Sequence, residues 1–424
     1  MSERRVGGVH RVPGDKSITH RALMLAALSP GRSSIGGALT ALDARSTATL
    51  LRQLGADISP LRAGVEVTVT GRRALQMPVQ TLHCGNSGTT ARLMLGILAA
   101  HAFEARLTGD QSLRRRPMGR VSSPLSAMGA AILQGSAGGL PITIRGGALK
   151  PIEWLLPIAS AQVKSAILLA AAVAGVEARI TEPGESRDHT ERMLAALGFG
   201  VTRHAGTICF TPTGRFAPFD IVVPGDPSSA IFLVGAALIA TGGSLDITEV
   251  GLNPTRTAAL TVLQRMGAFI GISQTGTQAG EPVGRLTVQP ARLVSTTVLA
   301  GEVPGLIDEI PMLACLAARA EGTTRFCGVG ELRVKESDRL ELIASNLNAV
   351  GGRATVDGDD LVVDGTDRSF VGSVRTNGDH RIAMAFMVLA TEPRNRIIVD
   401  DPGSAAVSFP GFPAALAALF VEHK

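Results

Sequence analysis

The sequence predicts a protein of the α/β class with two similar domains, each built from three repeated units that surround buried helices. The first observation behind this prediction is a series of polar or charged clusters that open short apolar helices at intervals of 66 to 82 residues. The second is a helix that ends in glycine and leads into a strand, which recurs at intervals of 69 to 84 residues. Two different landmarks with one period indicate an internal repeat. The clusters begin at Lys16, Asn86, Ser160, Asp226, Asp308 and Asp379, and the glycines are Gly55, Gly129, Gly198, Gly267 and Gly351.

The first helix of each unit consists of small apolar residues, as in the stretch 166–174. A helix without a polar stripe is buried on all sides or lies in a membrane. Charged residues interrupt each run well before the roughly 18 residues that a membrane span requires. We therefore expect these helices to be enclosed by sheet.

The remaining elements of each unit follow in order. Short strands bounded by turn residues are expected after the first helices, for example at 104–110 and 244–248. A second, amphipathic helix comes next and ends at the recurring glycine, which adopts the left-handed conformation without steric cost. The last unit stops after the apolar run 412–419, so the N-terminal strand near residues 9–12 is expected to complete it.

Six units divide into two domains, each of a size that a single core supports. The expected N-terminal domain covers residues 14–224, and the expected C-terminal domain combines residues 1–13 with 225–424. The chain would cross between the domains near Pro13 and near Pro224.

Composition bears on location and cofactors. Hydrophobic residues make up 45% of the chain, and the first five residues lead into no apolar signal segment, so a cytoplasmic protein is expected. The four cysteines lack Cys-x-x-Cys spacing, which favours small buried side chains over a zinc site or disulfides. His20, His189 and His380 have no partners at the spacing of a metal site or a catalytic triad. The sequence therefore predicts no metal and no cofactor.

The net charge of +5 raises the question of nucleic-acid binding. A protein that binds single strands needs aromatic stacking platforms, and this chain has one Trp, no Tyr and 3% aromatic residues. Many of its unusual cations instead stand at helix starts, where exposed N–H groups and the helix dipole favour small anions.

Each cluster has an ordinary explanation when it is taken singly. Ser17, Asp226 and Asp308 could cap helices, and single cations could be solvated surface charges. The segment 13–17 lacks the glycine spacing of a phosphate loop. Several cations at the mouths of buried helices are nevertheless unfavourable unless an anion compensates them. The set Lys16, Lys164 and Arg381 therefore predicts a bound anion.

The densest polar segment covers residues 331–340. Lys335 and Arg339 are four residues apart, which predicts that they share one helical face, with Glu336 one step round. The segment could be a solvated helix with surface ion pairs. Alternatively, the two cations bind an anionic substrate and Glu336 is a proton donor tuned by burial and charge.

Several motifs together resemble the 5-enolpyruvylshikimate-3-phosphate synthase family, in the order of that family and from Pro13 to Phe409. They are the segments 13–22, 85–93, 116–118, 160–165, 333–339 and 379–381. The resemblance implies two domains of three βαβαββ-type units with the helices inside, the enolpyruvyl transferase fold. It also implies transfer of the enolpyruvyl group of phosphoenolpyruvate to the 5-hydroxyl of shikimate 3-phosphate, a step toward chorismate and the aromatic amino acids.

The resemblance implies roles for individual residues. The catalytic set is Lys16, Asp308 and Glu336. The set expected at shikimate 3-phosphate is Lys16, Ser17, Arg21, Ser160, Ala161, Gln162, Arg187, Asp308 and Lys335. The set expected at phosphoenolpyruvate is Lys16, Gly88, Arg116, Gln162, Arg339 and Arg381.

The implied reaction explains the cations. Two phosphates and two carboxylates bring roughly five negative charges to one site. Asp308 would take the 5-hydroxyl proton, and Glu336, helped by Lys335 and Lys16, would protonate the methylene carbon and later remove a proton from it. An open cleft between the domains would close on the first substrate, and the protein is expected to act as a monomer.

Two positions depart from common patterns of the family. Many relatives carry a lysine where this chain has Val407, so one phosphoenolpyruvate contact is in question. Some relatives carry alanine at the position of Gly88, where a methyl group would crowd the phosphoenolpyruvate pocket and hinder glyphosate. Gly88 therefore predicts sensitivity to glyphosate.

Two alternative functions fit parts of the sequence less well. The sister family transfers enolpyruvate to UDP-N-acetylglucosamine, but it has a loop cysteine where this chain has Gln111 and Lys-Asn where this chain has Lys16 and Ser17. A noncatalytic anion- or RNA-binding protein on the same scaffold is disfavoured by the few aromatic residues and by the presence of both Asp308 and Glu336. The expected partners are therefore small anionic substrates, with neither nucleic acid nor membrane.

Overall fold

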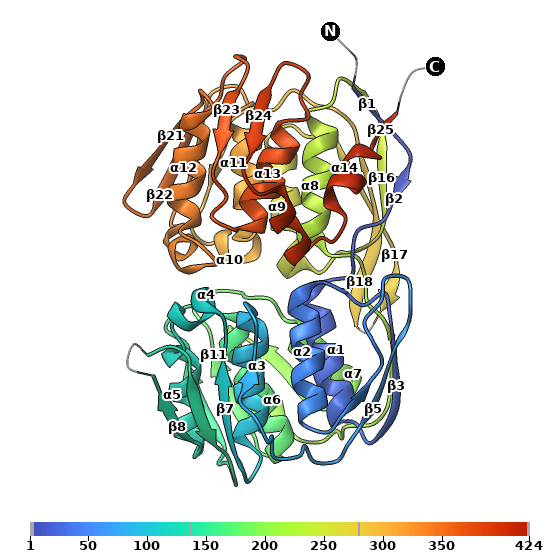
Figure 1. Ribbon diagram of the computed structural model, residues 1–424, viewed down its shortest axis with the longest axis vertical. Helices are drawn as coiled ribbons and strands as arrows, with labels where there is room; N and C mark the ends of the chain where they lie inside the picture. Colours follow the sequence, from blue (N-terminus) through green and yellow to red (C-terminus); the bar gives the residue numbers. More distant parts are fainter. Residues whose placement is uncertain (1–3, 136–137, 279, 422–424) are drawn as a thin grey trace. The chain divides into compact units, whose positions relative to one another are not determined.

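A computed structural model describes residues 4–135, 138–278 and 280–421, and the chain divides into two compact units (Figure 1). The N-terminal unit contains Gly14–Val223 together with Thr277–Glu281. The C-terminal unit contains residues 1–13, 224–276 and 282–424. The chain therefore begins in the C-terminal unit, builds most of the N-terminal unit without interruption, and then returns.

The N-terminal unit encloses its first helices with mixed four-stranded sheets. In each sheet a parallel pair is followed by two antiparallel neighbours, as in the order β10-β11-β13-β12. The other orders are β14-β3-β5-β4 and β6-β7-β9-β8. The strands are β3 (Gly31–Gly36), β4 (Asp57–Ile58), β5 (Val67–Gly71), β6 (Leu82–His83), β7 (Glu104–Thr108), β8 (Ala131–Gln134), β9 (Ile142–Arg145), β10 (Ile152–Leu155), β11 (Ala178–Thr181), β12 (Gly200–His204), β13 (Thr207–Thr211) and β14 (Asp220–Val222). The helices are α1 (Lys16–Leu28), α2 (Leu42–Gln53), α3 (Gly88–Ala99), α4 (Gln111–Arg115), α5 (Gly119–Met128), α6 (Ala161–Ala174) and α7 (His189–Ala196).

The C-terminal unit has two sheets of the same four-stranded plan and two shorter sheets. Its strand orders are β17-β18-β16-β2, β19-β20-β22-β21, β23-β24 and β15-β1-β25. The strands are β1 (Arg5–Val6), β2 (Val9–His10), β15 (Gly242–Gly243), β16 (Leu245–Gly251), β17 (Ile270–Gln278), β18 (Glu281–Val288), β19 (Thr297–Val298), β20 (Thr323–Phe326), β21 (Arg353–Asp357), β22 (Asp360–Asp364), β23 (Val371–Val374), β24 (Arg396–Val399) and β25 (Phe420–Val421). The helices are α8 (Pro227–Leu238), α9 (Ala258–Arg265), α10 (Val303–Leu306), α11 (Ile310–Ala317), α12 (Arg339–Ala349), α13 (His380–Leu389) and α14 (Phe412–Ala417), with 3-10 turns η1 (Pro254–Arg256), η2 (Gly330–Val334) and η3 (Pro402–Val407).

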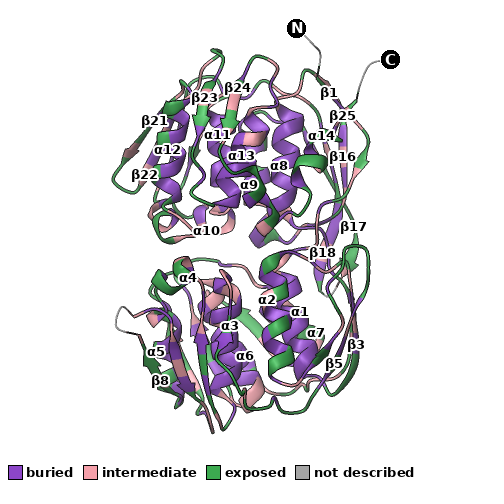
Figure 2. Cartoon of the chain, in the orientation of Figure 1, coloured by how far each residue is buried: buried purple, intermediate pink, exposed green. Residues whose placement is uncertain are grey.

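The small-residue helices are buried, as the sequence predicts (Figure 2). Every residue from Val163 to Ala172 of α6 is buried, and so is every residue from Ser228 to Leu238 of α8. Small residues allow close packing: a methyl group added to Gly96 of α3 would lie 2.2 Å from the carbonyl oxygen of Ala166 in α6. Within the described residues, no helix is long and apolar enough to cross a membrane.

The recurring glycines end the second helices as expected. Gly55, Gly129, Gly198, Gly267 and Gly351 all have φ between 83° and 117°, in the left-handed region that favours glycine. The predicted α/β fold with repeated units and buried helices is therefore confirmed.

The expected completion of the last unit by residues 9–12 is wrong. Val9 and His10 form β2, which pairs in parallel with β16 of the fourth unit. The hydrogen bond from Asp226 N to Pro13 O, 2.9 Å long, holds this segment beside the start of α8. The preceding strand β1 instead pairs with β25, which follows the last helix, with Arg5 opposite Val421.

Candidate active site

The start of α1 carries the first group of predicted site residues. Asp15 caps this helix by accepting a hydrogen bond from Ile18 N, 2.9 Å long, so Ser17 is not the cap. The Lys16 ammonium lies 3.3 Å from the carboxylate of Asp43 in α2. A cation at the positive end of the α1 dipole is thus partly compensated by a carboxylate of the protein itself.

Arg21, one turn further along α1, is 3% exposed and joins three helices. Its guanidinium donates hydrogen bonds to Thr190 Oγ1 at 2.6 Å, to Ser165 Oγ at 2.7 Å and to Ser17 O at 3.0 Å. Burial lowers the pKa of Arg21 to about 10, although Glu191 acts in the opposite direction. The neutral oxygens orient the guanidinium without neutralising it.

The predicted shikimate 3-phosphate residues of α6 lie at its first turn. Ser160 is the N-cap, but its side chain makes no capping hydrogen bond. Ser160, Ala161 and Gln162 are half-buried, and so is Arg187 in the loop that precedes α7. A helix N-terminus whose capping side chain is not engaged offers N–H donors to an anion.

Lys164 corrects one expectation from the sequence. Its ammonium is fully buried, 3.1 Å from Glu182 and 2.8 Å from Glu191, and donates to Ser186 O at 2.9 Å. The anion that compensates Lys164 is therefore supplied by two carboxylates of the chain, and this lysine does not need a substrate anion.

Three of the predicted phosphoenolpyruvate residues, Gly88, Arg116 and Gln162, lie at or beside the start of α3. Ser87 caps the helix, accepting a 3.1 Å hydrogen bond from Thr90 N, and Gly88 is the first helical residue. A methyl group on Gly88 would lie 2.6 Å from Nη1 of Arg92 and 3.4 Å from Nη1 of Arg116. Arg116 is 8% exposed and donates to Asn86 Oδ1.

Arg92 is a site residue that the sequence reasoning did not assign. It donates to Gln162 Oε1 at 2.9 Å and to Pro117 O at 3.1 Å, so it connects α3, α6 and the loop after α4. Gln162 in turn donates to Thr89 Oγ1 at 3.1 Å. Its position four residues after Gly88, on the same helical face, was a signal that could have identified Arg92.

In the C-terminal unit, Arg339 is the centre of a cluster of carboxylates. The side chain is buried and lies 2.8 Å from Asp379, 2.5 Å from Glu336 and 3.4 Å from Asp308. Burial alone lowers the pKa of Arg339, but the carboxylates of Asp379, Glu336 and Asp308 raise it above its ordinary value. Burial raises the pKa of Asp379, but Arg339 more than offsets this and the pKa is lowered.

Arg381, in the first turn of α13, orients Asp308 from a second side. Its guanidinium donates to Asp308 O at 3.0 Å and lies 3.8 Å from Asp308 Oδ2. Asp379 caps α13 by accepting from Arg381 N at 3.0 Å. Asp226 caps α8, accepting from Ser228 N at 2.8 Å, whereas Asp308 precedes α11 without capping it.

The prediction of one helical face for Lys335 and Arg339 is wrong. The segment consists of the turn η2, which ends at Val334, and of α12, which begins at Arg339. Asp338 caps α12 by accepting from Glu341 N, and Lys335 is extended with ψ of −150°. Lys335 and Glu336 are half-buried, and Glu336 still reaches Arg339.

His20, His189 and the cysteines are buried or half-buried, and the two histidines contact other side chains of the protein. His20 lies 2.7 Å from Thr47 Oγ1, and burial, with the cations Lys16 and Arg21, lowers its pKa to about 3. His189 lies 2.7 Å from Glu281. Cys84 and Cys315 are buried, and Cys209 and Cys327 are half-buried. In the part of the chain that the structure describes, no group of three or more His, Cys, Asp or Glu could hold a metal ion.

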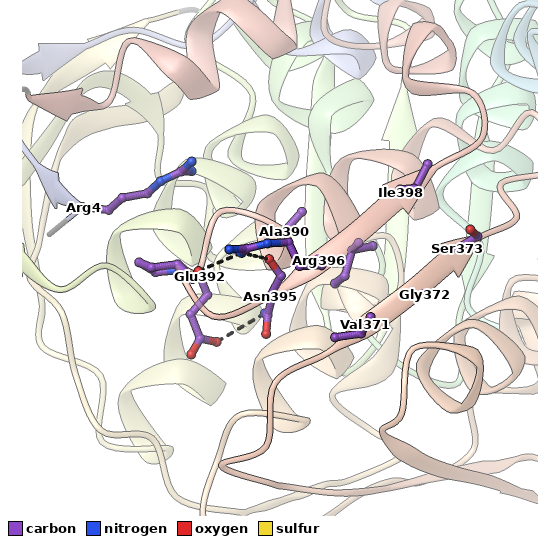
Figure 3. Close-up of a pocket in the computed structure, with 11 residues that line it drawn as sticks. Arg4, Val371, Gly372, Ser373, Ala390, Glu392, Asn395, Arg396 and Ile398 are labelled. Carbon is purple, nitrogen blue, oxygen red and sulfur yellow. Dashed lines mark hydrogen bonds between the residues drawn. The ribbon is translucent and has the colours of Figure 1, made fainter. Parts of the chain in front are cut away.

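A pocket of about 570 Å³ lies elsewhere, over β23 and β24 of the C-terminal unit (Figure 3). Its lining includes Arg4, Val371, Glu392, Asn395 and Arg396. It contains none of the predicted site residues, and the carboxylate of Glu392 is bonded to Arg319 and Arg394. The predicted site residues stand mainly at the helix starts instead. Val407, at the position where many relatives carry lysine, ends η3 and is half-buried.

The fold and the clusters at the helix starts define an α/β transferase of the enolpyruvyl transferase fold. An EPSP synthase (3-phosphoshikimate 1-carboxyvinyltransferase) family model matches residues 2–416. The chain is 46% identical to the 3-phosphoshikimate 1-carboxyvinyltransferase of Alkalilimnicola ehrlichii, over 95% of this chain and 91% of that protein. It is 47% identical to the protein of the same name from Gluconobacter oxydans, over 97% and 95% of the two chains.

Solved structures agree with this result. EPSP synthase from Acinetobacter baumannii is 38% identical, with a TM-score of 0.87 over 99% of this chain and 97% of that chain. The enolpyruvyl transferase NikO from Streptomyces tendae, 19% identical with a TM-score of 0.76 over 98% and 95% of the two chains, shares the fold. The chain belongs to the EPSP synthase family, and its activity is 3-phosphoshikimate 1-carboxyvinyl transfer in the shikimate pathway.

Proposed function

We propose that the clusters at the helix starts bind shikimate 3-phosphate and phosphoenolpyruvate and carry out the transfer between them. The observation that carries this proposal is the cluster around Arg339, where Asp308 and Glu336 lie within 3.4 Å and 2.5 Å of one guanidinium. Two carboxylates held on one buried cation have fixed positions, which acid–base catalysis requires.

Shikimate 3-phosphate would be bound mainly by residues of the N-terminal unit. Ser160, the Ala161 backbone and Gln162 would hold the shikimate side and its phosphate at the first turn of α6, and Arg187 would add a cation. Ser17 and Arg21 would bind the shikimate ring and its carboxylate. The hydrogen bonds from Arg21 to Ser165 and Thr190 support this proposal, because they fix α1 against α6 and α7.

The residues proposed to bind phosphoenolpyruvate stand mainly at helix starts. In the N-terminal unit these are Lys16, Gly88, Arg116 and Gln162, and in the C-terminal unit Arg339 and Arg381. An arginine binds carboxylate and phosphate oxygens two at a time through its planar fork.

The reaction would proceed by addition followed by elimination. The 5-hydroxyl oxygen bonds to C2 of phosphoenolpyruvate while Asp308 accepts the hydroxyl proton, and the methylene carbon C3 takes a proton from Glu336. In the tetrahedral intermediate the C2–O bond to phosphate then breaks, and C3 returns a proton to Glu336 as the double bond forms again. Lys335 and Lys16 would assist Glu336 by stabilising its ionised form.

The cations would neutralise the charge that the substrates bring. Two phosphates and two carboxylates amount to roughly five negative charges. Donors that are already oriented stabilise such charge without reorganisation during the reaction. The protein is proposed to act as a monomer in the cytoplasm, on small anions alone and without a metal or cofactor.

The assignment can be tested by phosphate release from purified protein. Phosphoenolpyruvate with shikimate 3-phosphate should release phosphate, and phosphoenolpyruvate with UDP-N-acetylglucosamine should not. Arg187→Ala should raise the KM for shikimate 3-phosphate with little change in the KM for phosphoenolpyruvate, and Arg116→Ala should do the reverse. Equal effects of both variants on both substrates would contradict the division of the site.

A further inference from the structure

Lys164 is a buried cation that the proposed reaction does not use. It lies at the end of the first turn of α6 and has no solvent exposure. Its backbone N–H donates to Ser160 O at 3.2 Å, so it belongs to the turn that begins with the proposed phosphate-binding residues. Its ammonium reaches the other way, to Glu182, Glu191 and Ser186 O.

Glu182, directly after β11, gathers donors from several elements. It accepts from Lys164 at 3.1 Å, from Ser186 Oγ at 2.6 Å and from Ser186 N at 3.3 Å. Arg203 of β12 adds a further contact at 2.9 Å. The side chains of Lys164 and Glu182 are both fully buried. Such a pair has little freedom to move, because separating two buried opposite charges loses a strong attraction that the surrounding protein screens weakly.

These contacts hold the loop between β11 and α7 at both of its ends. Glu182 starts the loop, Ser186 lies near its far end, and Glu191 of α7 makes the second contact with Lys164. Arg187 follows Ser186 directly and is half-buried. One lysine thus connects the turn of α6 that begins at Ser160 with the loop that carries Arg187.

We infer that Lys164, Glu182 and Ser186 form a positioning clamp that sets Arg187 against the first turn of α6 for the 3-phosphate of the substrate. None of the three is proposed to touch the substrate. The inference rests on the proposed role of Arg187. A cation on a surface loop loses conformational freedom when it binds, and a loop that is already fixed has less to lose.

The central test uses Ser186→Ala, which removes the hydroxyl bond to Glu182 and leaves every charge in place. We expect the KM for shikimate 3-phosphate to rise about 10-fold, the factor that corresponds to one hydrogen bond to a charged group. The KM for phosphoenolpyruvate should change less than about 2-fold, which corresponds to a small fraction of one such bond. The matched control is Ser29→Ala, which removes another buried hydroxyl of this unit, bonded to Leu25 O at 2.8 Å, and should leave both KM values unchanged.

A double-mutant cycle separates positioning from stability. Arg187→Ala alone should raise the KM for shikimate 3-phosphate, and Ser186→Ala should add little in that background, because the side chain that it positions is absent. Lys164→Met should act like Ser186→Ala but more strongly. If Lys164→Met fails to fold in a urea titration, Ser186→Ala decides the question.

The outcomes distinguish the two levels of the proposal. No effect of Arg187→Ala would overturn the assignment of Arg187 to the substrate, and the clamp with it. An effect of Arg187→Ala combined with a Ser186→Ala variant that behaves like Ser29→Ala would overturn the clamp alone. Equal increases in both KM values would show a general loss of structure and would also overturn it.

Discussion

Two buried arginines, Arg21 in α1 and Arg339 at the start of α12, are held in different ways. Arg21 donates to Thr190, Ser165 and the carbonyl of Ser17, all neutral oxygens, and burial lowers its pKa to about 10. Arg339 contacts the carboxylates of Asp379, Glu336 and Asp308, which raise its pKa above the ordinary value.

The difference indicates that the surroundings of Arg21 and of Arg339 serve different functions. A buried guanidinium that is oriented by neutral oxygens gains stability when an anion arrives. A guanidinium shared among carboxylates has its charge balanced within the protein, and its carboxylates are groups that can exchange protons. The start of α1 is therefore suited to binding an anion, and the start of α12 to proton transfer.

The largest expected effect tests the proposed proton transfer by Asp308. Asp308→Asn keeps the size of the side chain but removes the group that accepts a proton, so kcat should fall about 10²- to 10⁴-fold. Both substrates should still bind, as measured by calorimetry. Turnover at the wild-type rate would refute the role of Asp308.

The next effect compares the two arginines directly. Arg339→Met leaves three carboxylates around an uncharged side chain, and the free energy of unfolding should fall by about 3–5 kcal/mol. Arg21→Met leaves neutral groups without a donor and should cost about 1–3 kcal/mol. Urea titrations measure both. Similar losses would contradict the contrast between carboxylate and neutral partners, and Arg21→Met should in addition raise the KM for shikimate 3-phosphate.

A smaller effect concerns the start of α3. The wild-type protein should be inhibited by glyphosate in the micromolar range. Gly88→Ala places a methyl group 2.6 Å from Arg92 Nη1, which has to move. We expect the inhibition constant for glyphosate and the KM for phosphoenolpyruvate to rise at least about 5-fold, since overpacking typically costs 1–3 kcal/mol. Indifference of the wild-type protein to millimolar glyphosate would contradict the prediction.

A pH dependence of stability also separates the two regions. Below its ordinary pKa of 6.5, His20 takes up a proton in the unfolded chain but not in the folded protein, where its pKa is about 3. The free energy of unfolding should therefore fall as pH is lowered from 6.5 toward 3, by up to about 1.4 kcal/mol per pH unit.

Asp379 acts in a different pH range. Its folded pKa lies below the ordinary 3.8, so its stabilisation is present above pH 3.8 and is lost only as pH falls through the lower folded value. Unfolding titrations between pH 6.5 and 4 should thus report on His20 at the start of α1 and on His101 after α3, whose pKa burial also lowers. His20→Gln should flatten this slope, and an unchanged slope would show that other groups cause it.

The repeat and its buried helices could be predicted from the sequence because both depend on local patterns. A run such as 166–174 has no polar stripe wherever it lies in the fold. The partners of Lys164 could not be predicted in this way, because Glu182 and Glu191 belong to other elements. A cation at a helix start has the same sequence pattern whether its anion comes from a substrate or from the chain.

The prediction of one helical face for the segment 335–339 failed for a related reason. A spacing of four residues indicates a shared face only if one helix covers both positions. Asp338 is a capping residue and starts a new helix at Arg339, where Asp379 accepts hydrogen bonds from Arg339 and Ser337. The charged groups around Arg339 could thus be predicted, but their geometry could not.

The order of the chain has a consequence for biosynthesis. Arg5 and Val9 pair with Gly242 and Asp246, whereas the N-terminal unit is built almost entirely from the segment between them. At a translation rate of about 5–20 residues per second, β1 and β2 remain without their partner strands for on the order of ten seconds or more. The N-terminal unit can mature on the ribosome during that time, and the C-terminal unit is completed only when the last strand, β25, has been synthesised.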